Sequence, residues 1–211
     1  MKINTEKSNI MLFNFSRKYD FPPELMFSDG TTLEVIPEVT LLGIVVSEDL
    51  KWYKNTNNIT QKAMKRIWIL RRLKKIGSSV SFMTDVYIKE IRSLLEQSVP
   101  LWHNALTLTQ DAQIERVKKT TLYVILGNSY INYEDACSLS GLDTLKQRRE
   151  SLCYSFAKKN LKSNDILFTK DNITLNLRRD KQKVKEYFCN TKRFEKSPLP
   201  YLAKLLNSNA G

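Results

Sequence analysis

Hydrophobic and polar residues alternate in short runs along the first part of the chain. The runs "IMLFNFS", "FPPELMFSDGTTLEVI" and "VTLLGIVV" are separated or interrupted by Pro-Pro, by Asp29-Gly30 and by other turn residues. Such alternation is typical of β-strands, and Asp-Gly is a strong hairpin signal. We therefore expect a small antiparallel β meander in residues 1–53, in which "VTLLGIVV" is the third strand.

After residue 53 the apolar residues recur at intervals of three and four. The first segment of this kind starts at the polar string "NTNNIT" and stops at Gly77. Its apolar residues share one face of an α-helix, and Gly is a common helix terminator. The residues expected on this buried face are Ile59, Ala63, Ile67, Leu70 and Leu73.

The same spacing predicts further helices downstream. Their expected limits are Ser78 or Ser79 to Pro100, Thr109 to Gly127, Tyr133 to Gly141, and a helix that Asp143 caps. Caps of Ser, Thr and Asp and stops at Gly or Pro are the usual helix boundaries. The residues expected to face the core are Val80, Met83, Val86, Tyr87, Ile91, Leu94, Leu95, Ile114, Val117, Ile125, Leu145, Leu152 and Phe156.

This order of elements predicts an α+β chain, a small N-terminal β meander followed by a mostly α-helical bundle. We expect a β-rich part in residues 1–53 and a helical bundle in residues 54–162. Residues 163–211 are expected to form an irregular extension with a short helix, and "ILFTKDNITLNLRR" within it is a possible strand pair.

The charge of the chain is unusual for a globular protein. Lys and Arg number 34 against 22 Asp and Glu, which gives a formal net charge of +12 at pH 7. Such an excess makes nucleic acid the first expected partner and an anionic membrane surface the second. A basic protein without such a partner is the alternative. Residues 1–9 lack the apolar core of a signal peptide and no transmembrane run follows, so we expect an intracellular chain, nuclear or cytoplasmic.

Candidate catalytic residues are scarce. The cysteines, Cys137, Cys153 and Cys189, are too far apart in sequence for a metal-ligand motif, and His103 is the only histidine. No glycine-rich phosphate loop is present. The string "YEDA" at 133–136 lacks the second acidic residue of a metal-binding pair and is better explained as a solvated helix start. We therefore expect no catalytic residue, metal site, cofactor or small-molecule substrate in this chain.

The strongest functional signal is the charge of the basic helix from Ile59 to Ile76. The candidate nucleic-acid-binding residues are Lys62, Lys65, Arg66, Arg71, Arg72, Lys74 and Lys75. No acidic residue alternates with them, so they are suited to neutralise the phosphates of a backbone. The alternative is a solvated helix face that serves solubility. Trp52, Tyr53 and Trp68 are candidates for stacking on bases, although Trp68 is equally suited to a core position.

Six strings of the chain stand out in order: "NTEKSNIMLF", "LLGIVVSEDLKW", "IRSLLEQSVPLW", "IERVKKTTLYVILG", "LDTLKQRRESLCYSFAKK" and "SPLPYLAKLLN". In this order they resemble the C-terminal part of the reverse transcriptase of non-LTR (LINE-like) retrotransposons. Each is weak alone, and together they cover nearly the whole chain.

This resemblance implies a primer-grip hairpin followed by a thumb that holds the template-primer duplex. The primer-grip-like residues would be Leu42, Gly43, Ile44, Lys51 and Trp52. The aromatic-x-Asp-Asp box of the family is missing, so the resemblance implies a truncated fragment that is inactive as a polymerase by itself. Its Mg²⁺ ions would belong to the missing palm, and the missing polymerase portion is a possible partner. The alternative is a stand-alone basic helical module for protein–protein interaction.

Overall fold

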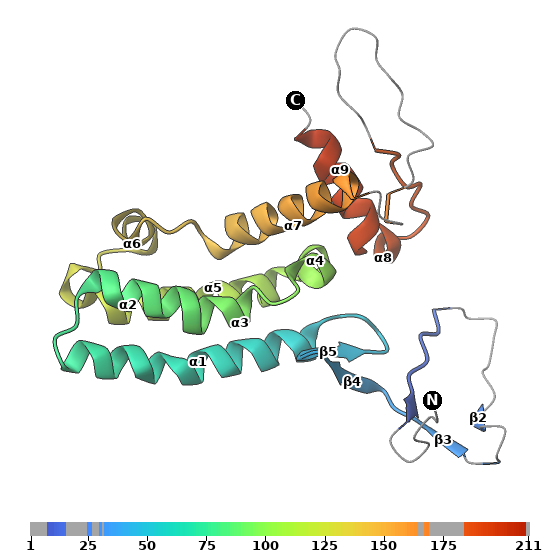
Figure 1. Ribbon diagram of the computed structural model, residues 1–211, viewed down its shortest axis with the longest axis horizontal. Helices are drawn as coiled ribbons and strands as arrows, with labels where there is room; N and C mark the ends of the chain where they lie inside the picture. Colours follow the sequence, from blue (N-terminus) through green and yellow to red (C-terminus); the bar gives the residue numbers. More distant parts are fainter. Residues whose placement is uncertain are drawn as a thin grey trace, which may run out of the picture. The chain divides into compact units, whose positions relative to one another are not determined.

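The strands of the chain come first and the helices follow, so the fold is α+β as the sequence predicts. A computed structural model describes residues 8–15, 25–26, 30, 32–163, 167–168 and 184–209. The chain divides into two compact units, Met1–Asn58 and Ile59–Gly211. The boundary falls within the first helix, α1 (Tyr53–Lys75), shown in Figure 1.

The first unit contains a sheet of three very short strands, β1 (Asn9–Ile10), β2 (Leu25–Met26) and β3 (Thr32–Val35), in the order β1-β3-β2. β2 and β3 are antiparallel, with Leu25 opposite Leu33, as the Asp-Gly hairpin signal predicts. β1, however, pairs with β3 in parallel, so the expectation of a purely antiparallel meander is wrong for this strand. Parallel partners cannot be joined by a tight hairpin, and β1 and β3 are accordingly far apart in sequence.

The expected third strand is in fact a hairpin of two strands, β4 (Glu38–Leu41) and β5 (Ile44–Ser47). They are antiparallel, with Leu41 opposite Ile44, and only Leu42 and Gly43 form the turn. Both turn residues have positive φ, 49° and 85°. That is the backbone of the tightest hairpin turns, which usually carry Asn-Gly or Asp-Gly. Leucine at the first turn position conceals the turn in the sequence.

The second unit is helical. The segment after α1 is continuous in Figure 1 but changes its winding: α2 (Val80–Val86) and α3 (Ser93–Leu95) flank a π-helical stretch, η2 (Tyr87–Arg92). The remaining elements are α4 (Val99–Trp102), η3 (His103–Ala105), α5 (Leu108–Leu126), η4 (Gly127–Ser129), α6 (Tyr133–Ser140), α7 (Leu145–Lys162), α8 (Lys192–Glu195) and α9 (Pro198–Ser208).

The observed helix ends agree with those expected from the sequence at some positions and differ at others. Gly127 ends α5 and Gly141 ends α6, as expected. The caps are Thr107 rather than Thr109 and Thr144 rather than Asp143, because each of these threonines forms a capping box with the glutamine three residues later. Pro100 does not close a helix; it lies in the first turn of α4, where its missing N–H costs no hydrogen bond.

The core of the second unit lies between α1, the α2–η2–α3 segment, α5 and α7. Its fully buried side chains include Leu70, Ile91, Leu122 and Trp102. In α7 the buried positions are Leu145, Arg149, Cys153 and Ala157, spaced by four. Phe156 is therefore directed away from the core and is 39% exposed, contrary to expectation. Val80, also expected inside, is 45% exposed.

The C-terminal helix α9 belongs to this core. Leu202, Ala203 and Leu206 are buried, and α9 packs against α4 and α7. The Asn207 side chain accepts a hydrogen bond from the backbone N–H of Val184 and donates one to its carbonyl. The strand pair expected around residues 166–179 lies outside the described residues, apart from 167–168.

Candidate nucleic-acid interface

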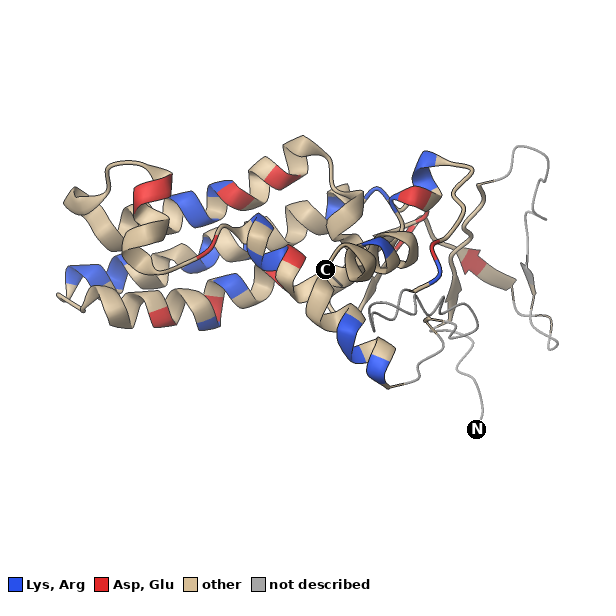
Figure 2. Ribbon diagram, turned by 90° about the horizontal axis from the view of Figure 1, so that it is seen from above, with Lys and Arg blue, Asp and Glu red and all other residues tan. Residues whose placement is uncertain are grey.

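The solvent face of α1 carries the cations that the sequence singles out. Lys62, Lys65, Arg71, Arg72 and Lys75 are all exposed. In the part of the chain that the structure describes, none of these side chains has a hydrogen bond or an ion pair. The helix contains no acidic residue, whereas α5 and α7 carry both signs (Figure 2). Among the described residues, nothing neutralises these charges.

The arrangement of these residues follows from helix geometry. Lys65, Trp68, Arg72 and Lys75 succeed one another at intervals of three and four, so they form a row along one face. At 1.5 Å per residue, the row is about 15 Å long. A row of this kind follows a single phosphate backbone better than it fits a compact anion.

Arg66 and Lys74 belong to the same candidate set, but the structure gives them different surroundings. The Arg66 guanidinium contacts the Glu90 carboxylate at 2.9 Å and donates a hydrogen bond to the Glu90 carbonyl at 2.8 Å. Lys74 Nζ donates to the carbonyls of Val124 and Ile125 at 2.7 and 3.1 Å. Those carbonyls lie at the C-terminal end of α5, where a cation is favoured. Both side chains thus attach α1 to its neighbours.

Trp68 is 59% exposed, so the alternative that it fills a core position is excluded. Together with Ile76, which is 77% exposed, it borders a shallow groove of about 400 Å³. The residues that line this groove are Trp68, Ile69, Arg72, Leu73, Lys75 and Ile76. An exposed indole beside a guanidinium is a surface on which a nucleobase or a sugar can pack.

The primer-grip-like residues lie on the β4–β5 hairpin and on the segment that follows it. Leu42 at the tip is 86% exposed, whereas Ile44 is buried. The Asn55 side chain accepts a hydrogen bond from the Val45 N–H at 3.2 Å, which joins β5 to the first turn of α1. The hairpin is therefore held at its base and presents an apolar tip.

The segment between β5 and α1 is tightly turned. Leu50 and Trp52 have φ values of 51° and 60°, a region that few non-glycine residues adopt. Asp49 accepts hydrogen bonds from the Lys51 N–H and the Ser47 hydroxyl and pairs with the Lys51 ammonium at 3.2 Å. Burial alone would raise the pKa of Asp49, but these contacts outweigh it and lower the pKa. Trp52 is half-buried and Tyr53 is exposed.

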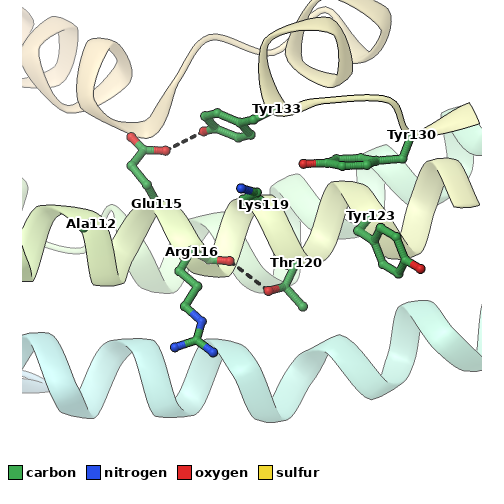
Figure 3. A pocket seen from close by; sticks show the side chains of 8 residues that line it. All are labelled: Ala112, Glu115, Arg116, Lys119, Thr120, Tyr123, Tyr130 and Tyr133. Atoms are coloured by element: carbon green, nitrogen blue, oxygen red, sulfur yellow. Dashed lines mark hydrogen bonds between the residues drawn. The ribbon is translucent and has the colours of Figure 1, made fainter.

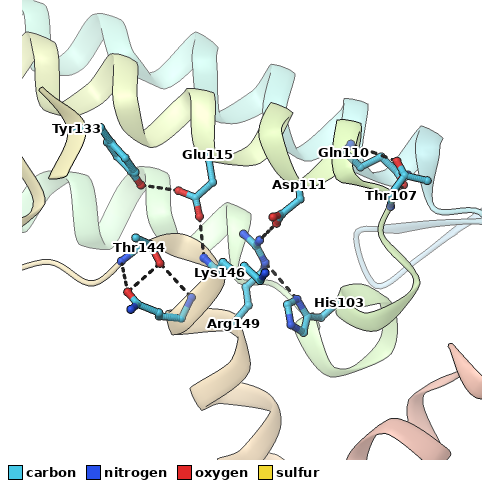
Figure 4. A network of polar contacts seen from close by, with 10 residues as sticks. His103, Thr107, Gln110, Asp111, Glu115, Tyr133, Thr144, Lys146 and Arg149 are labelled. Atoms are coloured by element: carbon cyan, nitrogen blue, oxygen red, sulfur yellow. Dashed lines mark hydrogen bonds and ion pairs between the residues drawn. The ribbon is translucent and has the colours of Figure 1, made fainter.

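A second set of cations lies inside the second unit, outside the candidate residues of the sequence (Figure 4). Arg149, with no exposed surface, pairs with Asp111, and its Nε donates to His103 Nδ1 at 3.4 Å. Burial and the neighbouring Arg149 lower the pKa of His103 to about 4. Lys118, 1% exposed, donates to the carbonyls of Leu142 and Asp143. Asp111 and Arg149 are far apart in sequence, so no local signal predicts this network.

No catalytic centre is visible in the described ranges. Among those residues, no group of three or more His, Cys, Asp or Glu side chains is placed to hold a metal ion. Glu134 and Asp135 of the "YEDA" string lie exposed in the first turn of α6, which Asn132 caps. The cysteines are unpaired. None of the described helices combines the length and the apolarity that a membrane span requires.

Comparison of the chain with protein-family models, with curated proteins and with solved structures finds no match. The geometry of α1 and of the β4–β5 hairpin is therefore the basis on which a function can be inferred.

Proposed function

We propose that the chain binds the backbone of duplex nucleic acid through the solvent face of α1, as the primer-grip and thumb portion of a non-LTR reverse transcriptase would. The observation that carries this proposal is the row of exposed cations on α1 that have no partner among the described residues. A helix that only kept the chain soluble would commonly mix both signs.

The charges of α1 suit recognition of a backbone rather than of a base sequence. Exposed Lys and Arg side chains neutralise phosphates and release condensed counterions, whatever the sequence. Trp68 adds an apolar surface in the middle of the row. Its proposed role is to pack on a sugar or base that the phosphate contacts bring close.

The attachment of α1 to its neighbours also supports this role. Arg66 fixes it to η2 and Lys74 fixes it to α5, while Gln113 of α5 donates to the Thr60 hydroxyl at 3.1 Å. A helix held at several points keeps its cations in a constant arrangement. Less conformational entropy is then lost on binding.

The test is the salt dependence of binding to a random-sequence duplex. We expect contact with about three to five phosphates and a slope of log affinity against log salt of roughly −3 to −4.5. Changing Lys62, Lys65, Arg72 and Lys75 together to Gln should flatten that slope by about 2 units. Gln is a good helix former, so circular dichroism should show no loss of helix.

A matched control removes the same amount of charge elsewhere. Lys89, Lys159, Lys162 and Lys204 are exposed and lie on other helices. Changing these four to Gln should flatten the slope by less than about 1 unit. Equal slopes in both quadruple variants would mean that binding follows net charge alone, and an unchanged slope in the α1 variant would show that this face is only solvated.

A further inference from the structure

A cleft lies where α5, η4 and the start of α6 meet (Figure 3). Its volume is about 620 Å³, within the range of small-molecule sites. The side chains that line it are Ala112, Glu115, Arg116, Lys119, Thr120, Tyr123, Tyr130 and Tyr133. None of these residues belongs to the duplex-binding face.

The aromatic walls of this cleft are ordered by contacts within the fold. Tyr123 and Tyr130 form an edge-to-face pair with ring centroids 5.5 Å apart and an interplanar angle of 75°. The Tyr133 hydroxyl donates to Glu115, and Lys118 Nζ lies 5.6 Å from the centre of the Tyr133 ring. Tyr123 is nevertheless 61% exposed, so ring surface is available to a ligand.

The Tyr130 hydroxyl is an unusual group in this cleft. It is buried, and no described residue forms a hydrogen bond with it. In Figure 3 it points toward Lys119 and Tyr133, over the cleft. A buried hydroxyl without a partner is costly. A ligand that offers a donor or an acceptor at this point would remove that cost.

The cations of the cleft are available to an anion. Arg116 and Lys119 are exposed and form no ion pair with the described residues. The nearest carboxylate, Glu115, already accepts hydrogen bonds from the Tyr133 hydroxyl and the Lys146 N–H. Lys119 follows Arg116 by three residues, so both side chains lie on one face of α5.

We propose that this cleft binds one nucleotide unit, with the base against Tyr123 and Tyr130 and the phosphate on Arg116 and Lys119. The Tyr130 hydroxyl then bonds a polar atom on the edge of the base. The same chemistry is offered by a free nucleotide and by an unpaired nucleotide of a single strand. This site reads a base, so it goes beyond the backbone binding proposed for α1.

The experiment uses a short single-stranded oligonucleotide that carries 2-aminopurine, whose fluorescence falls on stacking. Tyr123→Leu should weaken its binding by about 5- to 100-fold, as expected for the loss of one stacked base. Tyr130→Phe keeps the ring and removes only the hydroxyl, and should weaken binding by about 3- to 10-fold. The double change Arg116→Gln with Lys119→Gln should also weaken it.

The controls lie on α7, away from the cleft. Tyr154→Phe and the double change Lys158→Gln with Lys159→Gln should leave the quenching and the affinity unaltered. Circular dichroism and thermal unfolding check that each variant is folded. The α1 quadruple variant should lose duplex affinity but retain quenching, so the two proposals fail independently.

Competition separates the sources of the ligand. Displacement of the oligonucleotide by AMP indicates a site for a free nucleotide, and displacement only by longer strands indicates an unpaired nucleotide of a strand; both agree with the proposal. Displacement by inorganic phosphate as efficient as by AMP would reduce the cleft to an anion site and overturn it. Absence of quenching, or equal losses in the controls, would overturn it too.

Discussion

The helical unit contains two groups of cations that are placed in opposite ways. Lys65 and Arg72 of α1 are exposed and unpaired among the described residues, whereas Lys118 and Arg149 are almost completely buried. Each buried cation contacts an acceptor: Lys118 donates to carbonyl groups, and Arg149 pairs with a carboxylate. Burial of a charge is tolerated only with such partners.

This difference shows which charges stabilise the fold and which are free for a ligand. The number of Lys and Arg residues in the sequence does not distinguish the exposed cations from the buried ones, since both kinds stand beside other basic residues on amphipathic helices. Substitution should distinguish them. Replacement of a buried cation should lower stability and leave the salt slope of duplex binding unchanged. Replacement of an exposed cation of α1 should flatten the slope and leave stability unchanged.

The largest effect is expected from Asp111→Ala. The change leaves the Arg149 guanidinium buried without its carboxylate, and the free energy of unfolding should fall by about 3 kcal/mol in urea denaturation. The double variant with Arg149→Met should recover part of this loss because no unpaired charge remains. Asp85→Ala, at an exposed position of α2, should change stability by less than about 0.5 kcal/mol. A double variant less stable than Asp111→Ala would show that Arg149 does not depend on this partner.

A smaller loss is expected from Lys118→Met, which leaves the Leu142 and Asp143 carbonyls without their donor. We expect about 1–2 kcal/mol, since removal of the buried charge offsets part of the cost. The adjacent Lys119→Met changes an exposed residue and should stay within about 0.5 kcal/mol. Equal effects of the two changes on urea unfolding would contradict the distinction between buried and exposed cations.

His103 provides a test through pH. Its pKa in the folded chain is lowered to about 4 by burial and by Arg149, from an ordinary value of 6.5. The unfolded chain therefore binds the proton first, and stability should fall as pH decreases from about 6.5 toward 4. The facing groups are Arg149, Lys146 and the Tyr201 ring, whose centroid is 5.8 Å away.

Between pH 7 and pH 5 the free energy of unfolding should fall by about 1 kcal/mol, a value reduced because His103 is partly exposed. His103→Gln should remove it. Because the chain has a single histidine, one imidazole signal in the NMR spectrum reports its titration without assignment. A midpoint near 6.5 would mean that neither burial nor Arg149 affects the ring.

The smallest effect concerns Lys74, which is basic like its neighbours in α1 but engaged with α5. Lys74→Gln should lower the free energy of unfolding by about 0.5–1 kcal/mol, because the terminal carbonyls of α5 lose a charged donor. Lys75→Gln, one position further, should have almost no effect on stability and should weaken duplex binding. If Lys75→Gln lowered the thermal stability more than Lys74→Gln, Lys74 would not be one of the cations that stabilise the fold.

Local patterns predicted much of the helical unit. The apolar face of α1 and the ends of α5 and α6 at Gly127 and Gly141 depend on residues close in sequence. The β4–β5 turn was missed because Leu42 adopts a backbone conformation that leucine rarely shows. The inner face of α7 was misassigned because Arg149 is buried, and only a distant partner, Asp111, explains that burial.

The candidate site was predictable to a similar extent. The basic residues of α1 are evident from composition, and so is the absence of acidic residues between them. The sequence does not reveal that Arg66 contacts Glu90 or that Lys74 contacts α5, because these contacts join separate helices. The tyrosine cleft was missed for the same reason: its rings come from α5, α6 and the segment between them.

The contact between Lys74 and the end of α5 also restricts how this sequence can vary over time. Gly127 has a φ of 57°, and a Cβ atom added there would collide with Lys74 Nζ. Any larger residue at 127 therefore requires a shorter or displaced side chain at 74, and the positive φ strains it whatever residue stands at 74. In a lineage that retains the fold, glycine should persist at 127, and loss of Lys74 should lower only the steric part of the cost of replacing it.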